Sequence, residues 1–342
     1  MHTRSSAVCS FVALALPSVQ SRVPNDFWSP LAERSVIVTG AATGLGRSHA
    51  VLCARLGARV VVNDIGVTID GMQDSGASAA ATVAEIEDAG GTAVASTGSI
   101  ATEAGAASIV AAALDAFGRV DAVVNNAGIA RNASIESMSA DDFRAVLDVD
   151  VVGAFNVSRA AYATMKQQLY GRLVFTSSGS GLFGRTDGAN YAAAKAAMVG
   201  LSNAFALEGA DAGIFSNVLL PGARTRRRAA TVGESTQQAT GLTTVLEGRM
   251  EPEFVSPMVA YLASEACAVT KEIFSAVGGC YSRAFIGVSA GWLDPVAAPA
   301  GPADIDEHLA EIRDLASYKV PYTVFDEITS VANRLGAPKS AP

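Results

Sequence analysis

The feature that most restricts the fold of this chain is a regular alternation of short apolar runs and longer alanine-rich segments, which begins at Ser35. The runs are rich in β-branched residues and the alanine-rich segments have helical period, a pattern typical of repeated βαβ units. Helices on both faces of a parallel sheet explain why most of the runs are apolar throughout. The sequence therefore predicts a doubly wound α/β fold with a seven-stranded parallel sheet.

The same pattern predicts the positions of the elements and the division of the chain. We expect strands at 35–39, 59–63, 92–95, 121–124, 172–176, 216–220 and 272–277, and helices near 45–56, 76–89, 104–117, 141–169, 190–210 and 254–264. Residues 1–30 are expected to be a loose N-terminal extension, 31–290 the α/β domain with a mobile lid at 222–250, and 291–342 a C-terminal extension with helices near 305–317 and 325–335.

Composition excludes several classes of function. The 25 basic side chains are outnumbered by 33 acidic ones, and this balance opposes binding to a phosphate backbone, so we expect a small-molecule partner and no nucleic acid. No apolar run reaches the length of a bilayer span, so no membrane partner is expected. The four cysteines form no C-x-x-C pair, which indicates neither zinc nor a disulfide framework and fits a cytoplasmic location.

The first strand leads directly into a glycine-rich turn and then a helix. The turn has the sequence GAATGLG at 40–46, so Gly40, Gly44 and Gly46 lie between strand and helix, together with Thr43 and Leu45. Glycines let the backbone approach a pyrophosphate closely, and the helix N-terminus supplies unpaired N–H donors for the anion. A lone turn of this kind is weak evidence, since many such turns only pack a helix on a sheet.

The second strand makes a dinucleotide site more specific. It ends at Asp64, 24 residues after Gly40, close to the offset of about 20 residues at which a carboxylate binds the adenosine ribose. A carboxylate at this point repels a 2′-phosphate, so we predict NAD as the cofactor in preference to NADP. The alternative is that Asp64 only caps a turn.

A tyrosine and a lysine share one face of a predicted helix. Tyr191 and Lys195 are four residues apart, and a neighbouring ammonium favours the phenolate of a tyrosine, whose ordinary pKa is about 10. Ser178 follows the strand at 172–176, at the edge where ligands bind in open α/β sheets. Each residue alone has a structural explanation, but their occurrence downstream of a dinucleotide loop predicts a proton-transfer site that needs no metal.

These motifs together resemble the short-chain dehydrogenase/reductase family over residues 35–280. They are TGAATGLG at 39–46, NNAG at 125–128, Ser178, YAAAK at 191–195 and PG at 221–222. The resemblance implies an oxidoreductase with the Rossmann fold, in which Tyr191 is the acid/base, Lys195 assists it and binds the nicotinamide ribose, and Ser178 orients the substrate oxygen. It also implies a homodimer or homotetramer and further cofactor contacts from Asn125, Ala127, Gly128, Pro221 and Gly222.

Within this family the chain is similar to the (3R)-hydroxyacyl-CoA dehydrogenase units of peroxisomal multifunctional enzymes. The similarity is carried by 60–64, the insert 65–75, 170–184, 188–209 and 252–293. It implies a secondary alcohol of the 3-hydroxyacyl-CoA type as substrate, and a homodimer. A hydroxysteroid or terpenoid alcohol, and a catalytically weak NAD-binding protein, remain the alternatives.

Three positions depart from or add to the family pattern. Asp150 stands where the family usually has an asparagine that holds a proton-relaying water, and its charge is expected to oppose phenolate formation at Tyr191. Gly98 and Ser99 replace the acidic residue that usually contacts adenine. A basic cluster begins the lid and is a candidate clamp for the phosphates of coenzyme A, although a solvated loop explains it equally; it comprises Arg224, Arg226, Arg227 and Arg228.

Overall fold

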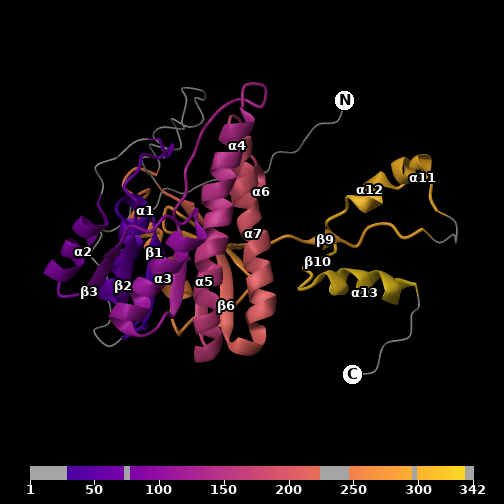
Figure 1. Cartoon of the computed structure of the whole chain (residues 1–342). Helices are drawn as coiled ribbons and strands as arrows, with labels where there is room; N and C mark the ends of the chain where they lie inside the picture. The colour runs from indigo at the N-terminus through magenta and orange to yellow at the C-terminus, as the bar shows by residue number, and fades with distance from the viewer. Residues whose placement is uncertain (1–28, 73–77, 224–245, 295–298, 336–342) are drawn as a thin grey trace, which may run out of the picture.

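The predicted α/β architecture is confirmed by a computed structural model, which describes residues 29–72, 78–223, 246–294 and 299–335. One sheet has the strand order β3-β2-β1-β4-β5-β6-β7-β8. Figure 1 labels β3, β2 and β1 side by side in it. Its strands are β1 (Ser35–Thr39), β2 (Arg59–Asn63), β3 (Thr92–Ser96), β4 (Ala122–Asn125), β5 (Gly171–Thr176), β6 (Ile214–Gly222), β7 (Ile273–Val277) and β8 (Cys280–Ala284). The order reverses between β1 and β4, where such sheets open a crevice for a ligand.

Helices cover both faces of the sheet, as alternation of side chains along the strands requires. In β1, Val36 and Val38 pack into one core and Ile37 into the other. The first core includes α1 (Gly44–Arg55), α2 (Ala79–Asp88) and α10 (Ser256–Leu262), and the second includes α3 (Glu103–Phe117), α5 (Gly153–Gln168) and α7 (Ala189–Gly209). Because both faces are buried, all five residues of β1 are buried.

The prediction of seven parallel strands was wrong at the edge of the sheet. The eighth strand, β8, pairs antiparallel with β7, with Val277 opposite Cys280. Between them Gly278 and Gly279 have φ angles of 61° and 82°, which suits the two-residue hairpin turns that require positive φ at both central positions. The Gly-Gly pair was therefore a sequence signal for this hairpin.

The single helix predicted for 141–169 was also wrong. It is divided into α4 (Ala140–Leu147), a π-helical turn over Asp148–Val152, and α5. A π-helical turn inserts an extra residue and is often found at functional sites. No proline or glycine inside 141–152 marks the break, but the turn includes Asp150, whose side chain is buried.

The C-terminal part lies beside the sheet rather than on it (Figure 1). Its described residues form two short strands that pair antiparallel, β9 (Val288–Ser289) and β10 (Tyr318–Lys319), and three helices, α11 (Pro302–Glu307), α12 (Leu309–Ile312) and α13 (Val324–Arg334). The single helix expected near 305–317 was wrong, because α11 and α12 divide this segment and the helical part ends at Ile312. Helix α13 buries no residue, and its apolar side chains Phe325, Ile328 and Val331 are exposed. Among the described helices none is long and apolar enough to cross a membrane.

A buried polar cluster joins α1 to α10. The Ser256 Oγ lies 2.7 Å from Oγ of Ser48 and 2.8 Å from Nδ1 of His49, and all three residues are buried. Complete burial lowers the pKa of His49 to about 3, because the imidazolium form loses its hydration. The fold therefore requires a neutral His49.

This requirement predicts a loss of stability in mild acid. The folded-state pKa lies below the unfolded value of 6.5, so the contribution of neutral His49 is complete above pH 6.5 and decreases as pH falls toward 3. We expect each pH unit in that range to remove up to about 1.4 kcal/mol of unfolding free energy. Denaturant unfolding at pH 6.5 and pH 5 should show a smaller decrease for His49→Asn than for the parent chain. The control His308→Asn, at a half-buried histidine outside the α1–α10 cluster, should keep the parent slope. An equal slope in His49→Asn would contradict the prediction.

Candidate active site

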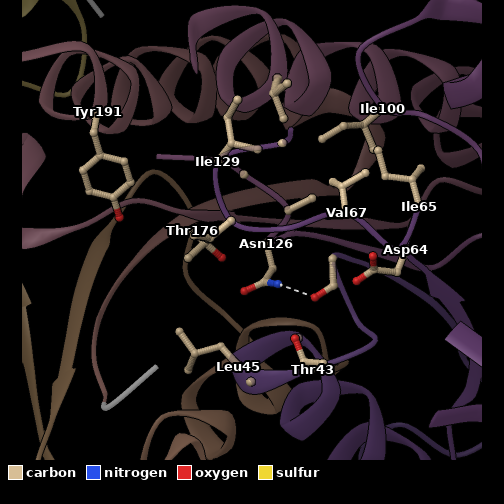
Figure 2. A pocket seen from close by; sticks show the side chains of 18 of the residues that line it. Thr43, Leu45, Asp64, Ile65, Val67, Ile100, Asn126, Ile129, Thr176 and Tyr191 are labelled. Atoms are coloured by element: carbon tan, nitrogen blue, oxygen red, sulfur yellow. Dashed lines mark hydrogen bonds between the residues drawn. The ribbon is translucent and has the colours of Figure 1, made fainter. Parts of the chain in front are cut away.

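A cavity of about 960 Å³ opens at the carboxyl edge of the sheet, on both sides of the β1–β4 crevice. Figure 2 shows Tyr191 at one end of this cavity and Asp64 with Ile65 at the other. Most of the residues expected to contact cofactor or substrate line it, namely Gly40, Thr43, Gly44, Leu45, Gly46, Asp64, Ala127, Gly128, Ser178, Tyr191 and Pro221. The cavity is therefore suited to an elongated ligand, and its two ends differ in chemistry.

The glycine-rich turn is tight enough to need glycine at two positions. Gly40 has a φ of 63°, and a Cβ there would lie 2.8 Å from Cα of Ala127. A Cβ on Gly46 would lie only 2.1 Å from the carbonyl oxygen of Gly40. Helix α1 begins directly behind this turn, with Thr43 as its N-cap residue. Its N-terminal N–H groups thus lie at the cavity wall, where an anion is favoured.

Hydrogen bonds join this turn to the loop that follows β4. The amide of Asn126 donates to the carbonyl oxygens of Thr39 and Gly40, at 2.9 and 3.1 Å. The backbone N–H groups of Asn126 and Ala127 both donate to Oγ1 of Thr39, at 3.1 Å. Asn126 therefore fixes both walls of the crevice, although sequence reasoning singled out its neighbour instead.

Besides Lys195, which is buried, two expected cofactor contacts lie outside the cavity lining. The amide of Asn125 donates to Oγ of Ser158 at 2.8 Å, inside the protein, so it stabilises β4 against α5. Gly222 ends β6, and a Cβ there would lie 2.5 Å from the side chain of Val277 in β7. Asn125 and Gly222 thus make packing contacts inside the protein, whereas Asn126 and Pro221 line the cavity.

Asp64 is held rigidly at the far end of the cavity. One carboxylate oxygen accepts the N–H of Ala42 at 3.0 Å and the other accepts that of Gly66 at 2.8 Å. Asp64 therefore caps the turn, which was the alternative to a role in cofactor binding, but it also lines the cavity. A carboxylate oxygen has more than one lone pair, so both oxygens can still accept a ribose hydroxyl.

Next to Asp64 the cavity is apolar. Ile65, Val67 and Ile100 line it together (Figure 2). Gly98, where the family usually has an acidic residue, also lines it, and its carbonyl oxygen accepts a hydrogen bond from Asn63 at 2.9 Å. A flat aromatic ring is suited to this apolar slot.

The segment 65–72 after β2 forms a strap along the cavity. The N–H of Ala130 donates to the carbonyl oxygen of Ile69 at 2.9 Å, and Nε of Arg131 donates to that of Asp70 at 3.0 Å. Arg131 also forms an ion pair with Asp142 of α4 at 3.1 Å. These contacts connect the strap to the loop after β4 and extend the wall of the site.

These features fit a dinucleotide. The turn at 40–46 offers a close backbone approach and a helix N-terminus for a diphosphate, Asp64 can accept the ribose hydroxyls, and the slot of Ile65, Val67 and Ile100 can pack an aromatic base. A nicotinamide portion would then extend toward Tyr191. The cavity is of the size that small-molecule cofactor sites have.

At the other end, Tyr191 is supported by a buried lysine. Tyr191 is 7 % exposed, and Nζ of Lys195 lies 5.6 Å from the centroid of its ring. Lys195 is held in place because its Nζ donates to the carbonyl oxygen of Thr176 at 3.1 Å, and its own carbonyl accepts the Ser177 hydroxyl at 2.6 Å. Helix α7 and the end of β5 thus fix the pair relative to the sheet.

Ser178 lies at the start of the short helix α6 (Gly179–Phe183). Its hydroxyl accepts the N–H of Ser180 at 3.2 Å as an N-cap, and the residue lines the cavity. The hydroxyl hydrogen is a donor that this cap leaves available for an oxygen of a substrate. Ser178 and Tyr191 therefore face the same cavity from two different elements.

Asp150 contacts Lys195 directly. Its Oδ2 lies 2.9 Å from Nζ of Lys195, and its Oδ1 accepts the N–H of Ile129 at 2.7 Å. A Cβ on Gly128 would lie 2.6 Å from both carboxylate oxygens, so this loop needs glycine to admit Asp150. The π-helical turn thus brings a buried ion pair close to Tyr191.

Some expected residues cannot be placed. The basic cluster at 224–228 and the larger part of the expected lid, 224–245, lie outside the described residues, as does the N-terminal extension up to residue 28. Leu246 and Met250 are described and precede α10. The clamp for coenzyme A therefore stays a prediction.

Comparison with known proteins agrees with this site. A model of the short chain dehydrogenase family matches residues 34–235, which include the glycine-rich turn, Ser178, Tyr191 and Lys195. The chain belongs to the short-chain dehydrogenase family. This short-chain dehydrogenase is 44% identical, over 289 residues, to a short-chain type dehydrogenase/reductase of Mycobacterium tuberculosis, covering 84% of this chain and 96% of the relative.

Other relatives are longer proteins. The dehydrogenase is 36% identical to the peroxisomal multifunctional enzyme type 2 of Mus musculus over 304 residues, 85% of this chain but only 38% of that enzyme. Its fold superposes on a short chain dehydrogenase from Mycobacterium avium with a TM-score of 0.70 and 38% identity, covering 83% and 97% of the two chains. For the full-length peroxisomal multifunctional enzyme type 2 of Drosophila melanogaster the TM-score is 0.73 at 30% identity, covering 89% of this chain and 50% of that chain.

The contact between Gly46 and Gly40 predicts the effect of one added methyl group. In Gly46→Ala the new Cβ meets a backbone oxygen that cannot rotate away, so the turn must open. We expect NADH affinity, measured by fluorescence titration, to fall at least about tenfold, equivalent to about 1.4 kcal/mol. Gly200→Ala is the matched control, because no atom lies within 4 Å of its Cβ in α7, and it should keep NADH affinity. Unchanged affinity in Gly46→Ala would contradict the assignment of the turn.

Proposed function

We propose that this short-chain dehydrogenase is an NAD-dependent oxidoreductase that interconverts a secondary alcohol and a ketone by hydride transfer. The observation that carries the proposal is the cavity itself, which has Tyr191 beside buried Lys195 at one end and Asp64 at the other. A bound nicotinamide supplies the hydride acceptor or donor. Everything else the reaction needs is a proton transfer and a fixed geometry.

The side chains at the nicotinamide end supply the proton transfer. Ser178 holds the substrate oxygen through its hydroxyl, and the oxygen of Tyr191 takes the hydroxyl proton as the carbinol carbon loses hydride. In the reverse direction Tyr191 gives that proton to the carbonyl oxygen. Lys195 contributes positive charge beside the ring, which favours the tyrosinate that accepts the proton. The products of oxidation are the ketone, the reduced nicotinamide and one proton.

Asp64 supports NAD as the cofactor. Both carboxylate oxygens are fixed by backbone N–H groups, so the side chain cannot turn away from a ligand in the cavity. A 2′-phosphate placed there would meet a like charge, whereas two ribose hydroxyls would find acceptors. The proposal therefore includes discrimination against NADP.

For the substrate we propose a 3-hydroxyacyl-CoA-like alcohol. The support is the similarity to peroxisomal multifunctional enzymes and to the peroxisomal hydratase-dehydrogenase-epimerase of Saccharomyces cerevisiae, with which the chain is 38% identical over 251 residues. Free hydroxysteroid or terpenoid alcohols are the second candidate, because exposed Phe183 and half-buried Leu182 of α6 provide apolar surface close to Ser178 in the chain.

The proposal also includes assembly and location. A homodimer or homotetramer is supported by the exposed apolar side chains of α13, which would be covered in an assembly. A cytoplasmic location stays a prediction from the cysteine pattern of the sequence.

A substrate screen that follows NADH absorbance tests the reaction. The panel should contain a 3-hydroxyacyl-CoA, the same acyl group on a truncated thioester, a hydroxysteroid and a terpenoid alcohol. We expect the CoA thioester to give the highest kcat/KM, and Tyr191→Phe to lower kcat about 10²- to 10⁴-fold because the proton acceptor is lost. NADH affinity should be unchanged in the variant.

Full turnover in Tyr191→Phe would remove this residue from the mechanism. If the parent chain binds NADH but turns over no alcohol of the panel, a catalytically weak NAD-binding protein would be favoured.

Cofactor choice is tested separately at Asp64. The parent chain should use NAD with a kcat/KM at least about tenfold higher than with NADP, since a like charge costs about 1.4 kcal/mol or more. Asp64→Asn should reduce this ratio by weakening NAD and improving NADP. The matched control is Asp88→Asn on the exposed end of α2, which should leave the ratio unchanged. A parent enzyme that prefers NADP would refute the role given to Asp64.

A further inference from the structure

Two cations lie near the ring of Tyr191. Nζ of Lys195 lies 5.6 Å from the ring centroid, and Cζ of Arg185 lies 5.8 Å from the same centroid. Lys195 comes from the same helix as Tyr191, whereas Arg185 comes from the loop between α6 and α7. The ring is therefore in the field of two positive charges at nearly equal distance.

One of these charges is compensated. The carboxylate of Asp150 lies 2.9 Å from the ammonium group of Lys195, and both side chains are almost fully buried, at 0% and 2% exposure. Opposite charges this close act on a third group as a dipole, whose field is much weaker than that of a free cation. Lys195 alone therefore favours the tyrosinate less than an unpaired lysine would.

Arg185 is not compensated in this way. Its guanidinium donates to two uncharged oxygens, the carbonyl of Thr186 at 3.2 Å and the amide oxygen of Asn132 at 3.3 Å, and it forms no ion pair within the described part of the chain. Its side chain crosses Gly188, where a Cβ would lie 2.7 Å from Nε. The absence of a side chain at Gly188 thus allows Arg185 to fold back toward Tyr191.

The other charged groups around this end of the cavity are paired or exposed. Arg131, on the loop after β4, forms an ion pair with Asp142 of α4, and the Ser139 hydroxyl followed by Arg131 lowers the pKa of Asp142. Asp148 of the π-helical turn and Asp187 of the loop before α7 are exposed to water, which screens their charges. Arg185 therefore supplies the main uncompensated charge among the groups near the ring.

We propose that Arg185 is a positioning residue for the proton transfer: its positive charge stabilises the tyrosinate form of Tyr191 and offsets the negative charge that Asp150 places against Lys195. This inference rests on the proposed function, because it assigns a task to Tyr191 as proton acceptor. It also gives Asp150 and Arg185 opposite effects on the same ionisation.

The ionisation of Tyr191 can be measured without any substrate. Tyrosines labelled with ¹³C at Cζ give a resonance for each residue, and the Tyr191 signal is the one that disappears in Tyr191→Phe. In Arg185→Gln we expect the titration midpoint of this signal to move upward by about 0.5 to 1 pH unit, because a partly exposed cation about 6 Å away is lost. In Asp150→Asn the midpoint should move downward, and Arg185→Lys should keep the parent midpoint.

Arg159→Gln is the matched control. Arg159 lies on α5 with its Cζ 5.5 Å from the centroid of the Phe155 ring, so it has the same cation–ring geometry away from Tyr191. It should leave the Tyr191 midpoint unchanged. An unchanged midpoint in Arg185→Gln, or equal effects of Arg185→Gln and Arg185→Lys, would overturn the inference and leave Arg185 a structural residue. If the midpoints move as expected while the parent chain oxidises no alcohol, the proposed function fails and the electrostatic inference stands.

Discussion

The site depends on the way β1 and β4 are joined where the strand order reverses. Thr39 ends β1, and its hydroxyl accepts two N–H groups from the loop after β4, while the amide of Asn126 donates back to the first strand and to Gly40. These bonds hold two turns side by side at a fixed separation. Because the glycine-rich turn and the loop to Gly128 are both fixed there, the cavity between them is largely formed before a ligand binds.

Much of the fold could be predicted from the sequence, because the periodicity of apolar residues matches the burial pattern of the strands and helices. All seven expected strands are present, and β1 and β2 have the expected bounds. Two errors within the α/β domain have different origins. The hairpin to β8 is marked by the turn residues Gly278 and Gly279, which lie outside the periodic pattern of the parallel strands. The π-helical turn at 148–152 leaves no trace in residue type, because it depends on tertiary contacts such as the ion pair of Asp150.

The candidate site divides in the same way. Residues whose role depends on backbone conformation or on helix spacing, such as Gly46 and the pair Tyr191 and Lys195, could be placed from sequence spacing alone. Contacts between segments distant in the chain could not. Sequence spacing pointed to Asn125, but Asn126 is the residue that lines the cavity. The difference comes from the alternation of side chains along a strand, since adjacent side chains point to opposite sides. The approach of Arg185 to Tyr191 depends on the path of a loop that has no periodicity.

The strap at 65–72 has a consequence for how a nucleotide is exchanged. Its backbone oxygens at Ile69 and Asp70 accept hydrogen bonds from Ala130 and Arg131 of the loop after β4. The described ladders of β1 and β2 do not include residues of the strap, so a displacement of the strap would leave the pairing of these strands intact. Substitutions in the strap are therefore expected to affect ligand exchange more than the stability of the folded core.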